Sequence, residues 1–315
     1  MTHIKIATRK SPLALWQAEY VAAELQRLDA SVTTELVKIV TKGDKILDVP
    51  LAQVGGKGLF TKEIDDALLD GRADIAVHSM KDVPTELPAG TAIRAHPQRE
   101  DPRDAVATIT GGGLDTLPEG ARIGTSSLRR IAQLKPRYPS FEFVSIRGNI
   151  QTRLAKLGVE VDAVILAAAG VRRMGMDTQM HEFIDTNVLL PAVAQGTLGI
   201  QTRNTDDVIN ALVDRMNDTD TVDRTKAERA FLATLEGGCQ VPIAAYATLD
   251  GDKLHLEGLV SEVDGSRIIH ESINGPRSDA ARLGKELAER VLADGGGEIL
   301  ARFYANEIRE PLNKS

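Results

Sequence analysis

The segment DIAVHSMKDVP, residues 74–84, has the pattern of a short strand that runs into a charged turn. Residues 74–77 are expected to form the strand, because three of them are small or β-branched apolar residues. Lys81 and Asp82 then lie just past its carboxyl end. In open α/β sheets the ligand binds at that end of the strands, so the segment predicts a binding edge with one cation and one carboxylate. A surface turn before Pro84 is the simpler alternative.

Strand-like and helix-like segments alternate on both sides of this turn, which indicates an α/β fold. Ser11 and Pro12 mark the start of the first helix, because serine caps helix N-termini and proline suits the first helical position. Further helices are expected at 60–69 and after the capping segment Thr125-Ser-Ser. The expected strands are residues 4–8, 34–40, 122–124, 141–146, 162–167 and 198–202. The last of them is expected to return the chain to its starting domain.

Beyond about residue 219 the pattern changes to a helix at 225–235, three alternating strands and two more helices. A chain of 315 residues is long enough for two or three domains. We therefore predict a discontinuous first domain, a second domain inserted into it and a smaller α+β third domain. Their expected boundaries are 1–98 with 197–216, 99–196 and 217–315.

The chain has one cysteine and 42% hydrophobic residues. One cysteine excludes an internal disulfide and a cysteine-rich zinc site, and no metal is expected. The N-terminal MTHIKIATRK lacks the apolar core of a secretion signal, and the longest apolar run, 163–170, is too short to cross a bilayer. We therefore expect a cytoplasmic protein without a membrane partner.

A formal net charge of −7 argues against general nucleic-acid binding. Basic residues nevertheless gather in short segments that contain glycine or serine, which is typical of loops that bind a small anion. These cations are Arg9, Lys10, Lys57, Lys81, Arg129, Arg130, Arg147, Arg153, Arg172 and Arg173. Within this set Arg172 and Arg173, like the nearby Asp185, are expected to be solvated.

Two of the segments, GTSSLRR (124–130) and RGN (147–149), combine arginines with hydroxyls or free backbone N–H groups. Such groups at a helix start can hold a carboxylate or a phosphate. An ordinary capped helix with solvated arginines fits the first segment equally well. The recurrence of the pattern favours an anion site.

Cys239 lies in the segment LEGGCQVPI (235–243), where paired glycines allow a close approach and Pro242 stiffens the exit. A thiol on such a loop can be a nucleophile or a covalent anchor, whereas an inert, partly buried cysteine is the common alternative. The segment VGGKGLF (54–60) lacks the spacing of a phosphate-binding loop. A lid with Lys57 at its tip, or an exposed turn, explains it better.

Taken in order, these segments resemble the porphobilinogen deaminase family, also called hydroxymethylbilane synthases. The resemblance runs from about residue 4 into the C-terminal region. It rests on the motifs IATRKSPLALWQA, VGGKGLF, DIAVHSMKDVP, REDPRDA, GTSSLRR, RGNIQTRL, LPAVAQGTLGI and LEGGCQVPIAAYA. It implies an α/β fold with two periplasmic-binding-protein-like domains around a cleft, and a smaller α+β C-terminal domain that carries the cysteine.

The resemblance also implies a transferase of porphyrin, tetrapyrrole and heme biosynthesis. Such an enzyme deaminates four porphobilinogen units and condenses them head to tail on a dipyrromethane cofactor, which a thioether attaches to Cys239. Water then releases the linear tetrapyrrole hydroxymethylbilane. The expected protein is a monomer whose partner is the small molecule porphobilinogen, with no nucleic acid and no membrane.

By the same resemblance Asp82 is the catalytic residue, which would stabilise the pyrrole N–H groups as positive charge develops. The expected cofactor-binding residues are Lys81, Asp82, Thr125, Ser127, Arg129 and Arg130. The expected substrate-binding residues are Arg9, Ser11, Gln17, Arg147, Arg153 and Gln195. Lys57 and Phe60 match a mobile lid loop, and Arg173 corresponds to an arginine proposed to matter in later elongation.

Two other functions remain open from the sequence. Two binding-protein-like domains could form a cytosolic small-anion binding or sensor protein without catalysis, although such a protein has no need of an exposed thiol in a third domain. A phosphotransferase would require ATP and a metal site, and no cluster of Asp and Glu with suitable spacing is evident.

Overall fold

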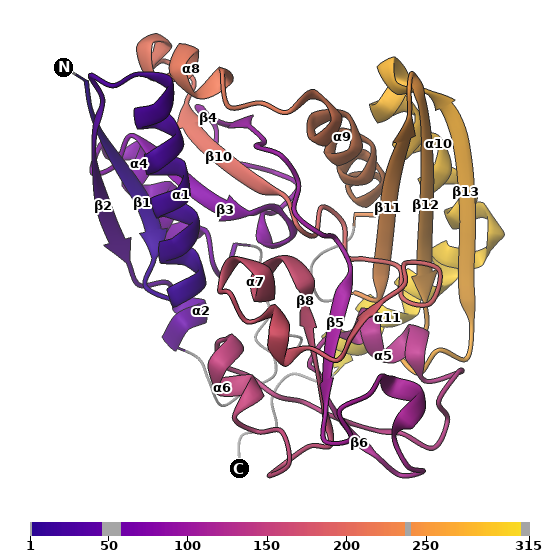
Figure 1. Cartoon of the computed structure of the whole chain (residues 1–315). Helices are drawn as coiled ribbons and strands as arrows, with labels where there is room; N and C mark the ends of the chain where they lie inside the picture. The colour runs from indigo at the N-terminus through magenta and orange to yellow at the C-terminus, as the bar shows by residue number, and fades with distance from the viewer. Residues whose placement is uncertain (1, 46–57, 237–240, 310–315) are drawn as a thin grey trace.

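The computed structural model describes residues 2–45, 58–236 and 241–309. Three β-sheets organise these residues. Figure 1 shows the first sheet at the left, the second at the lower centre and the third at the right. Among the described residues, no helix is both long and apolar enough to cross a membrane.

The first sheet contains β1 (His3–Arg9), β2 (Thr33–Ile39), β3 (Ile75–Ser79), β4 (Thr91–Ala95) and β10 (Leu198–Arg203). Its strand order is β2-β1-β3-β10-β4. β1 is parallel to β2 and β3, whereas β10 is antiparallel to β3 and β4. The helices of this half are α1 (Pro12–Leu28), α2 (Lys42–Lys45), α4 (Lys62–Leu69) and α8 (Asp207–Asp214).

The second sheet contains β5 (Asp104–Thr108), β6 (Arg122–Gly124), β7 (Glu142–Val144), β8 (Ala163–Ala167) and β9 (Glu182–Ile184). Its order is β7-β6-β8-β5-β9, in which β6 is parallel to β7 and β8 while β5 is antiparallel to β8 and β9. The helices are α5 (Leu128–Leu134), α6 (Ile150–Leu154) and α7 (Ala168–Arg173), with the 3₁₀ turns η2 (Leu114–Thr116) and η3 (Asp177–Gln179).

The two sheets have the same arrangement of strand directions. In each, three parallel neighbours are followed by one antiparallel strand, which is β10 in the first sheet and β5 in the second. Each of these strands is the first that the chain forms after it crosses from the other half, through residues 96–103 before β5 and 192–197 before β10. The prediction of two similar α/β domains is confirmed, as is the return of strand 198–202 to the first sheet.

The two crossing segments lie side by side. The backbone N–H of Glu100 donates to the carbonyl oxygen of Gly196 (3.3 Å). Gly196 has a φ of +90°, and a Cβ at this position would overlap the Glu100 carbonyl. Glycine is therefore required here, both for the backbone conformation and for the close approach of the two segments.

The third domain is a three-stranded antiparallel sheet covered by helices, as predicted. Its strands are β11 (Ile243–Asp250), β12 (Lys253–Ser261) and β13 (Ile268–Pro276), in the order β11-β12-β13. Its helical segments are α9 (Thr219–Thr234), η4 (Arg277–Asp279), α10 (Ala280–Val291), the π-helical turn η5 (Leu292–Gly296) and α11 (Gly297–Arg309). α9 and α10 bury Phe231 and Leu287 against Leu256 of the sheet. Figure 1 shows α9 between the first domain and β11.

The third domain also buries part of the first. The charged turn after β3 is the short 3₁₀ helix η1 (Met80–Asp82). Met80 and Val83 are buried in the same hydrophobic cluster as Phe231. The apolar residues of the turn thus anchor it to the third domain, while Lys81 and Asp82 point away from that cluster into a cavity.

Three strands and the start of α9 differ from the predictions. β4, β5 and β9 were not predicted, and α9 begins at Thr219 rather than at 225 because the Asp218 carboxylate accepts from Thr221 N (2.8 Å) and caps the helix. Ser127 is the N-cap of α5, but its side chain makes no capping hydrogen bond. The hydroxyl of Ser126 donates instead to Ile146 O (2.7 Å). The domain boundaries stay predictions.

Candidate active site

A cavity of about 500 Å³ lies where the three domains meet. Its lining includes Ser11 and Phe60 of the first domain, Ser127 of the second, and Leu232 and Val241 of the third. Among the lining residues that the structure describes, six have cationic side chains and two have carboxylates. The cations are Arg9, Lys81, Arg129, Arg130, Arg147 and Arg153, and the carboxylates are Asp44 and Asp82. The cavity therefore favours a ligand with several negative charges.

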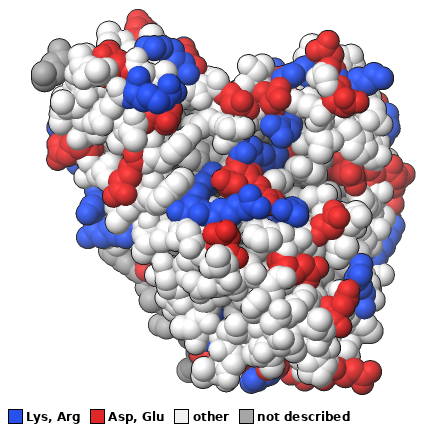
Figure 2. Space-filling model, viewed as in Figure 1, with Lys and Arg blue, Asp and Glu red and all other residues white. Residues whose placement is uncertain are grey.

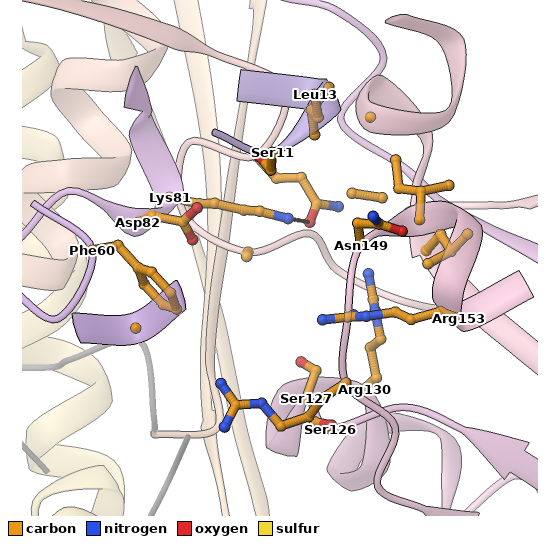
Figure 3. A pocket seen from close by; sticks show the side chains of 18 of the residues that line it. Ser11, Leu13, Phe60, Lys81, Asp82, Ser126, Ser127, Arg130, Asn149 and Arg153 are labelled. Carbon is orange, nitrogen blue, oxygen red and sulfur yellow. Dashed lines mark hydrogen bonds between the residues drawn. The ribbon is translucent and has the colours of Figure 1, made fainter. Parts of the chain in front are cut away.

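Lys81 and Asp82 enter the cavity from η1. Figure 3 shows them with Phe60 on one side, opposite Arg153 and Asn149. The Lys81 ammonium donates to Gln195 Oε1 (3.2 Å). Burial lowers the pKa of Lys81 to about 8, although the neighbouring Asp82 opposes this shift. Among the described residues, the carboxylate of Asp82 makes no hydrogen bond, so it can act on a ligand.

Arg129 and Arg130 reach the cavity from α5, but both are almost fully buried. Each forms an ion pair of 2.6 Å with Asp104, the first residue of β5. The alternative of an ordinary capped helix with solvated arginines is therefore excluded. Asp104 is a residue that the sequence analysis missed, because only the fold brings β5 beside α5.

Arg9 is the last residue of β1 and is held by two groups at once. Its guanidinium pairs with Asp44 and lies 4.3 Å from the centre of the Phe60 ring. Asp44 in turn accepts from the backbone N–H and the hydroxyl of Thr41 (3.1 and 2.8 Å). This clamp fixes Arg9 at the cavity wall, and Asp44 was also missed in the sequence.

The RGN segment and α6, which follows it, supply two further cations, Arg147 and Arg153. Arg153 of α6 donates from Nε to Gly148 O (2.9 Å), and Asn149 caps α6 by accepting from Thr152 N (2.8 Å). Burial lowers the pKa of Arg153 to about 10, with the nearby charges of Arg130 and Arg147 adding to the shift. The contribution of these like charges shows that the cations are close together, and an anion between them would relieve the repulsion.

Several predicted residues lie elsewhere. Gln17 is not part of the cavity lining within the described residues, because its side chain is buried behind the wall and donates to Ser79 Oγ (2.9 Å). Thr125 is likewise buried, and its hydroxyl accepts from Ser127 N (3.2 Å). Ser11 does line the cavity, and its Oγ also caps α1 by accepting from Ala14 N (3.3 Å).

Arg173 belongs to a second cavity, of about 330 Å³, which is lined in part by Trp16, Tyr20 and Glu100. It is half-buried rather than solvated, because Nη2 donates to Gly196 O (2.7 Å) and burial lowers its pKa to about 10. Arg172 is exposed, as expected, and pairs with Asp101 (3.0 Å). Figure 2 shows a hollow on this face, with basic and acidic side chains gathered over α7.

Lys57 and Cys239 lie outside the described residues. The residues that follow Cys239 are informative, since Val241 and Ile243 are buried and both line the first cavity. Leu232, which precedes it on α9, lines the same cavity. The described chain thus reaches the cavity on either side of the cysteine in sequence.

Known proteins match this chain along nearly its whole length. The sequence model of the porphobilinogen deaminase "dipyromethane cofactor binding domain" matches residues 4–211, and that of the porphobilinogen deaminase C-terminal domain matches residues 222–293. The chain belongs to the porphobilinogen deaminase family. Porphobilinogen deaminases of Geobacter sulfurreducens and Geobacter metallireducens are 52% and 53% identical to it, over 98% and 97% of this chain and 97% and 96% of theirs.

Solved structures that match this chain are more distant. The VFT2 domain of BvgS from Bordetella pertussis is 15% identical, with a TM-score of 0.39 over 68% of this chain and 86% of that one. The methionine binding protein MetQ is 11% identical, with a TM-score of 0.43 over 70% and 91%.

The cavity fits the cofactor for which the porphobilinogen deaminase domain is named. A dipyrromethane that carries acetate and propionate groups presents several carboxylates to be neutralised. Lys81, Arg129 and Arg130 line one part of the cavity as a group, and their N–H groups match carboxylate acceptors. Among the lining residues that the structure describes, only Asp44 and Asp82 have carboxylates, while Asp104 pairs with both arginines from outside this lining.

Proposed function

We propose that this chain is a hydroxymethylbilane synthase. It deaminates four porphobilinogen units, joins them head to tail on a dipyrromethane primer attached to Cys239, and releases hydroxymethylbilane by hydrolysis. The observation that carries this proposal is the cavity, whose described lining has six cations against two carboxylates, one of which is Asp82. Each porphobilinogen brings two carboxylates, so a growing chain needs this surplus of positive charge.

Two groups of cations have different tasks. Lys81, Arg129 and Arg130 bind the carboxylates of the cofactor, together with the hydroxyl of Ser127. Arg9, Arg147 and Arg153 bind the acetate and propionate groups of the incoming substrate, together with Ser11. Burial and the nearby charges of Arg130 and Arg147 lower the pKa of Arg153, and a bound carboxylate relieves the repulsion among these cations, so substrate binding is favoured by charges that are already in place.

Each cycle breaks one C–N bond and forms one C–C bond. The aminomethyl nitrogen of porphobilinogen leaves as ammonia, its methylene carbon bonds to the free α-carbon of the terminal pyrrole, and that carbon releases its hydrogen as a proton. The bound dipyrromethane supplies the first free α-carbon. The Asp82 carboxylate stabilises the positive charge that develops on the pyrrole N–H while the C–N bond breaks. Its lack of a hydrogen bond among the described residues leaves it available for this task.

The remaining residues support these groups. Gln195 orients Lys81 through their hydrogen bond, and Phe60 covers the guanidinium of Arg9. Gln17 and Thr125 act on the cavity indirectly, from behind its wall. Gln17 does so through its hydrogen bond to Ser79, and Thr125 through the hydrogen bond that it accepts from the backbone N–H of Ser127. The roles of Lys57 in a lid and of Arg173 in later elongation stay predictions from the resemblance. We also propose that the protein is a cytoplasmic monomer.

Porphobilinogen consumption tests the proposal. The purified protein should consume porphobilinogen and release one ammonia for each molecule used, without ATP or added metal. A small-anion sensor would bind porphobilinogen without consuming it, and a phosphotransferase would require ATP. Cys239→Ser should fold normally but lack the thioether-linked cofactor, and a fully active, cofactor-bearing serine variant would refute the anchor.

A further inference from the structure

One buried carboxylate connects several side chains of the cavity. Asp104 is 0% exposed and does not itself line the cavity. Its Oδ2 accepts from Arg129 Nη2 (2.6 Å). Its Oδ1 accepts from Arg130 Nη2 (2.6 Å), Arg130 Nε (3.2 Å) and Gln195 Nε2 (3.0 Å). Both oxygens are thus fully used inside the protein.

The two arginines are held at both ends of their guanidinium groups. Arg129 Nη1 donates to Leu190 O (2.6 Å), and Arg130 Nη1 donates to Ile165 O (2.8 Å). A guanidinium is planar, so two fixed contacts determine where its remaining N–H groups point. Because both arginines line the cavity, Asp104 and these carbonyls determine the donor geometry that a ligand meets.

The network extends to the first domain through Gln195. The amide of Gln195 donates to Asp104 and to Pro102 O (2.7 Å), while its oxygen accepts from the Lys81 ammonium (3.2 Å). Asp104 therefore acts on Lys81 through one intermediate residue. Gln195 and Asp104 also lie at the ends of the two crossing segments, so the network joins both connections between the domains.

Asp104 also balances charge. Two buried guanidinium groups without a counterion would be strongly destabilising. Although burial disfavours its ionised form, the charges of Arg129 and Arg130 hold the pKa of Asp104 well below its usual range. The carboxylate is therefore ionised wherever the protein is folded, whether or not a ligand is present.

We propose that Asp104 is a positioning residue for the cofactor, which fixes Arg129, Arg130 and, through Gln195, Lys81 in the arrangement that receives the dipyrromethane carboxylates. This inference rests on the proposed function. The substrate group is held differently, with Arg9 paired to Asp44 and Arg153 bonded to Gly148 O. Loss of Asp104 should therefore affect cofactor retention far more than substrate affinity.

Asp101 provides a matched control. Its carboxylate is also buried and also pairs with two arginines, Arg103 (2.7 Å) and Arg172 (3.0 Å). It lies in the first crossing segment, three residues before Asp104, and it is not part of the described lining of the cavity. Asp101→Asn thus also removes a carboxylate that pairs with two arginines, although these are more exposed than Arg129 and Arg130, without touching the cofactor donors.

The test measures cofactor occupancy by intact mass, for wild type, Asp104→Asn and Asp101→Asn, with melting temperatures recorded in parallel. We expect Asp104→Asn to carry the two-pyrrole mass on a fraction of chains at least about tenfold lower than wild type, and Asp101→Asn to match wild type. The small population of loaded Asp104→Asn should keep a KM for porphobilinogen within about threefold of wild type. Occupancy equal to that of Asp101→Asn would overturn the proposal.

Asp104→Glu keeps the inference testable if the asparagine variant does not fold. It preserves the negative charge that the two arginines need, but one extra methylene displaces the carboxylate in a close-packed site. We expect it to fold and still to lose at least about half of its cofactor. A folded Asp104→Glu with wild-type occupancy would overturn the positioning role. If the wild type itself carried no pyrrole mass after incubation with porphobilinogen, the proposed function would fail instead.

Discussion

The two charged residues of η1 differ in how the protein holds them. Lys81 is half-buried and bonded to Gln195, whereas the carboxylate of Asp82 makes no hydrogen bond to described residues. Their neighbours Met80 and Val83 are fixed in the core of the third domain. A rigid turn thus presents one cation that is already oriented and one carboxylate that remains available for the reaction.

Asp82→Asn should separate binding from catalysis. The amide keeps the size of the side chain but loses the negative charge, so the cofactor should stay attached while turnover falls about 100-fold or more. Glu86→Gln is the control, because Glu86 is exposed nearby and does not line the cavity. Porphobilinogen consumption and intact mass on the same samples report both properties. Unimpaired turnover in Asp82→Asn would remove its catalytic role.

The pKa of Lys81 predicts a pH dependence of cofactor loading. Burial lowers this pKa to about 8, so Lys81 loses its charge as the pH rises through this value. Loading of apoprotein, followed by intact mass, should therefore slow between about pH 7 and about pH 9. Loaded enzyme should retain turnover to higher pH, because a bound carboxylate raises the pKa of the ammonium.

Lys81→Arg is the control for this titration, since a guanidinium keeps its proton throughout the range. Its loading rate should not fall between about pH 7 and about pH 9, whatever its absolute value. If Lys81→Arg showed the same decline as wild type, another group would be responsible.

The sequence predicted most of the cations of the cavity, because they lie in long motifs that resemble one family. It did not reveal their protein partners. Arg129 and Arg130 are 25 and 26 residues from Asp104 along the chain, and Arg9 is 35 residues from Asp44. Such pairings depend on which strands become neighbours, and no local pattern encodes them. Gln17 is the opposite case. It lies in a motif that predicted a role in the site, but its side chain is buried behind the cavity wall and donates to Ser79.

At the scale of elements, the contact between α9 and α10 stabilises the third domain. Gly284 of α10 faces the backbone of α9, where an added Cβ would overlap Ala227 O and lie 2.9 Å from the Ala230 Cβ. Two helices can approach this closely only with a small residue between them. The domain that carries Cys239 therefore depends on this glycine.

Gly284→Ala should lower the free energy of unfolding by about 1–3 kcal/mol, because backbone atoms of α9 must move to admit the methyl group. Gly297→Ala is the matched control at the start of α11, where the nearest atom is 3.4 Å away. Its helical conformation suits alanine, so it should be neutral or stabilising by up to about 1 kcal/mol. Urea unfolding of both variants measures the difference. Equal stability of the two would contradict the close-packing account.

The alternation of strand-like and helix-like segments predicted the strands that are long or that are followed by one of the charged motifs. It missed β5, whose five residues are all buried although polar residues 98–104 lead into it. It also missed β9, which has only three residues. A strand buried on both faces lacks the period of two that marks a half-exposed strand, so its sequence carries little signal.

At the scale of the whole molecule, the third domain contacts both crossing segments through the carboxylate of one residue, Glu228. Glu228 of α9 is 0% exposed and pairs with Arg99 of the first crossing (2.6 Å). Its second oxygen accepts from Ala194 N of the other crossing (2.6 Å), and its first accepts from Ala247 N of β11 (2.9 Å). One carboxylate thus connects all three domains.

Glu228→Gln should destabilise the protein strongly. It keeps the shape of the side chain but leaves the buried guanidinium of Arg99 without its counterion, at a cost of about 3–5 kcal/mol. Glu257→Gln is the control, because Glu257 pairs on the partly exposed face of β12 with His270 (3.2 Å) and should change stability by less than about 1 kcal/mol. Thermal unfolding compares the two. A Glu228→Gln variant as stable as the control would show that the domains are held together by other contacts.

The central claim is that Cys239 carries a dipyrromethane on which the protein assembles porphobilinogen. The most direct measurement is the intact mass of the purified protein, alone and after brief exposure to porphobilinogen, followed by peptide mapping. We predict an excess of two linked pyrroles on the peptide that contains Cys239, and then a ladder of single-pyrrole increments. A bare polypeptide mass that does not change on prolonged incubation with porphobilinogen would contradict the account and favour a protein that binds anions without reacting with them.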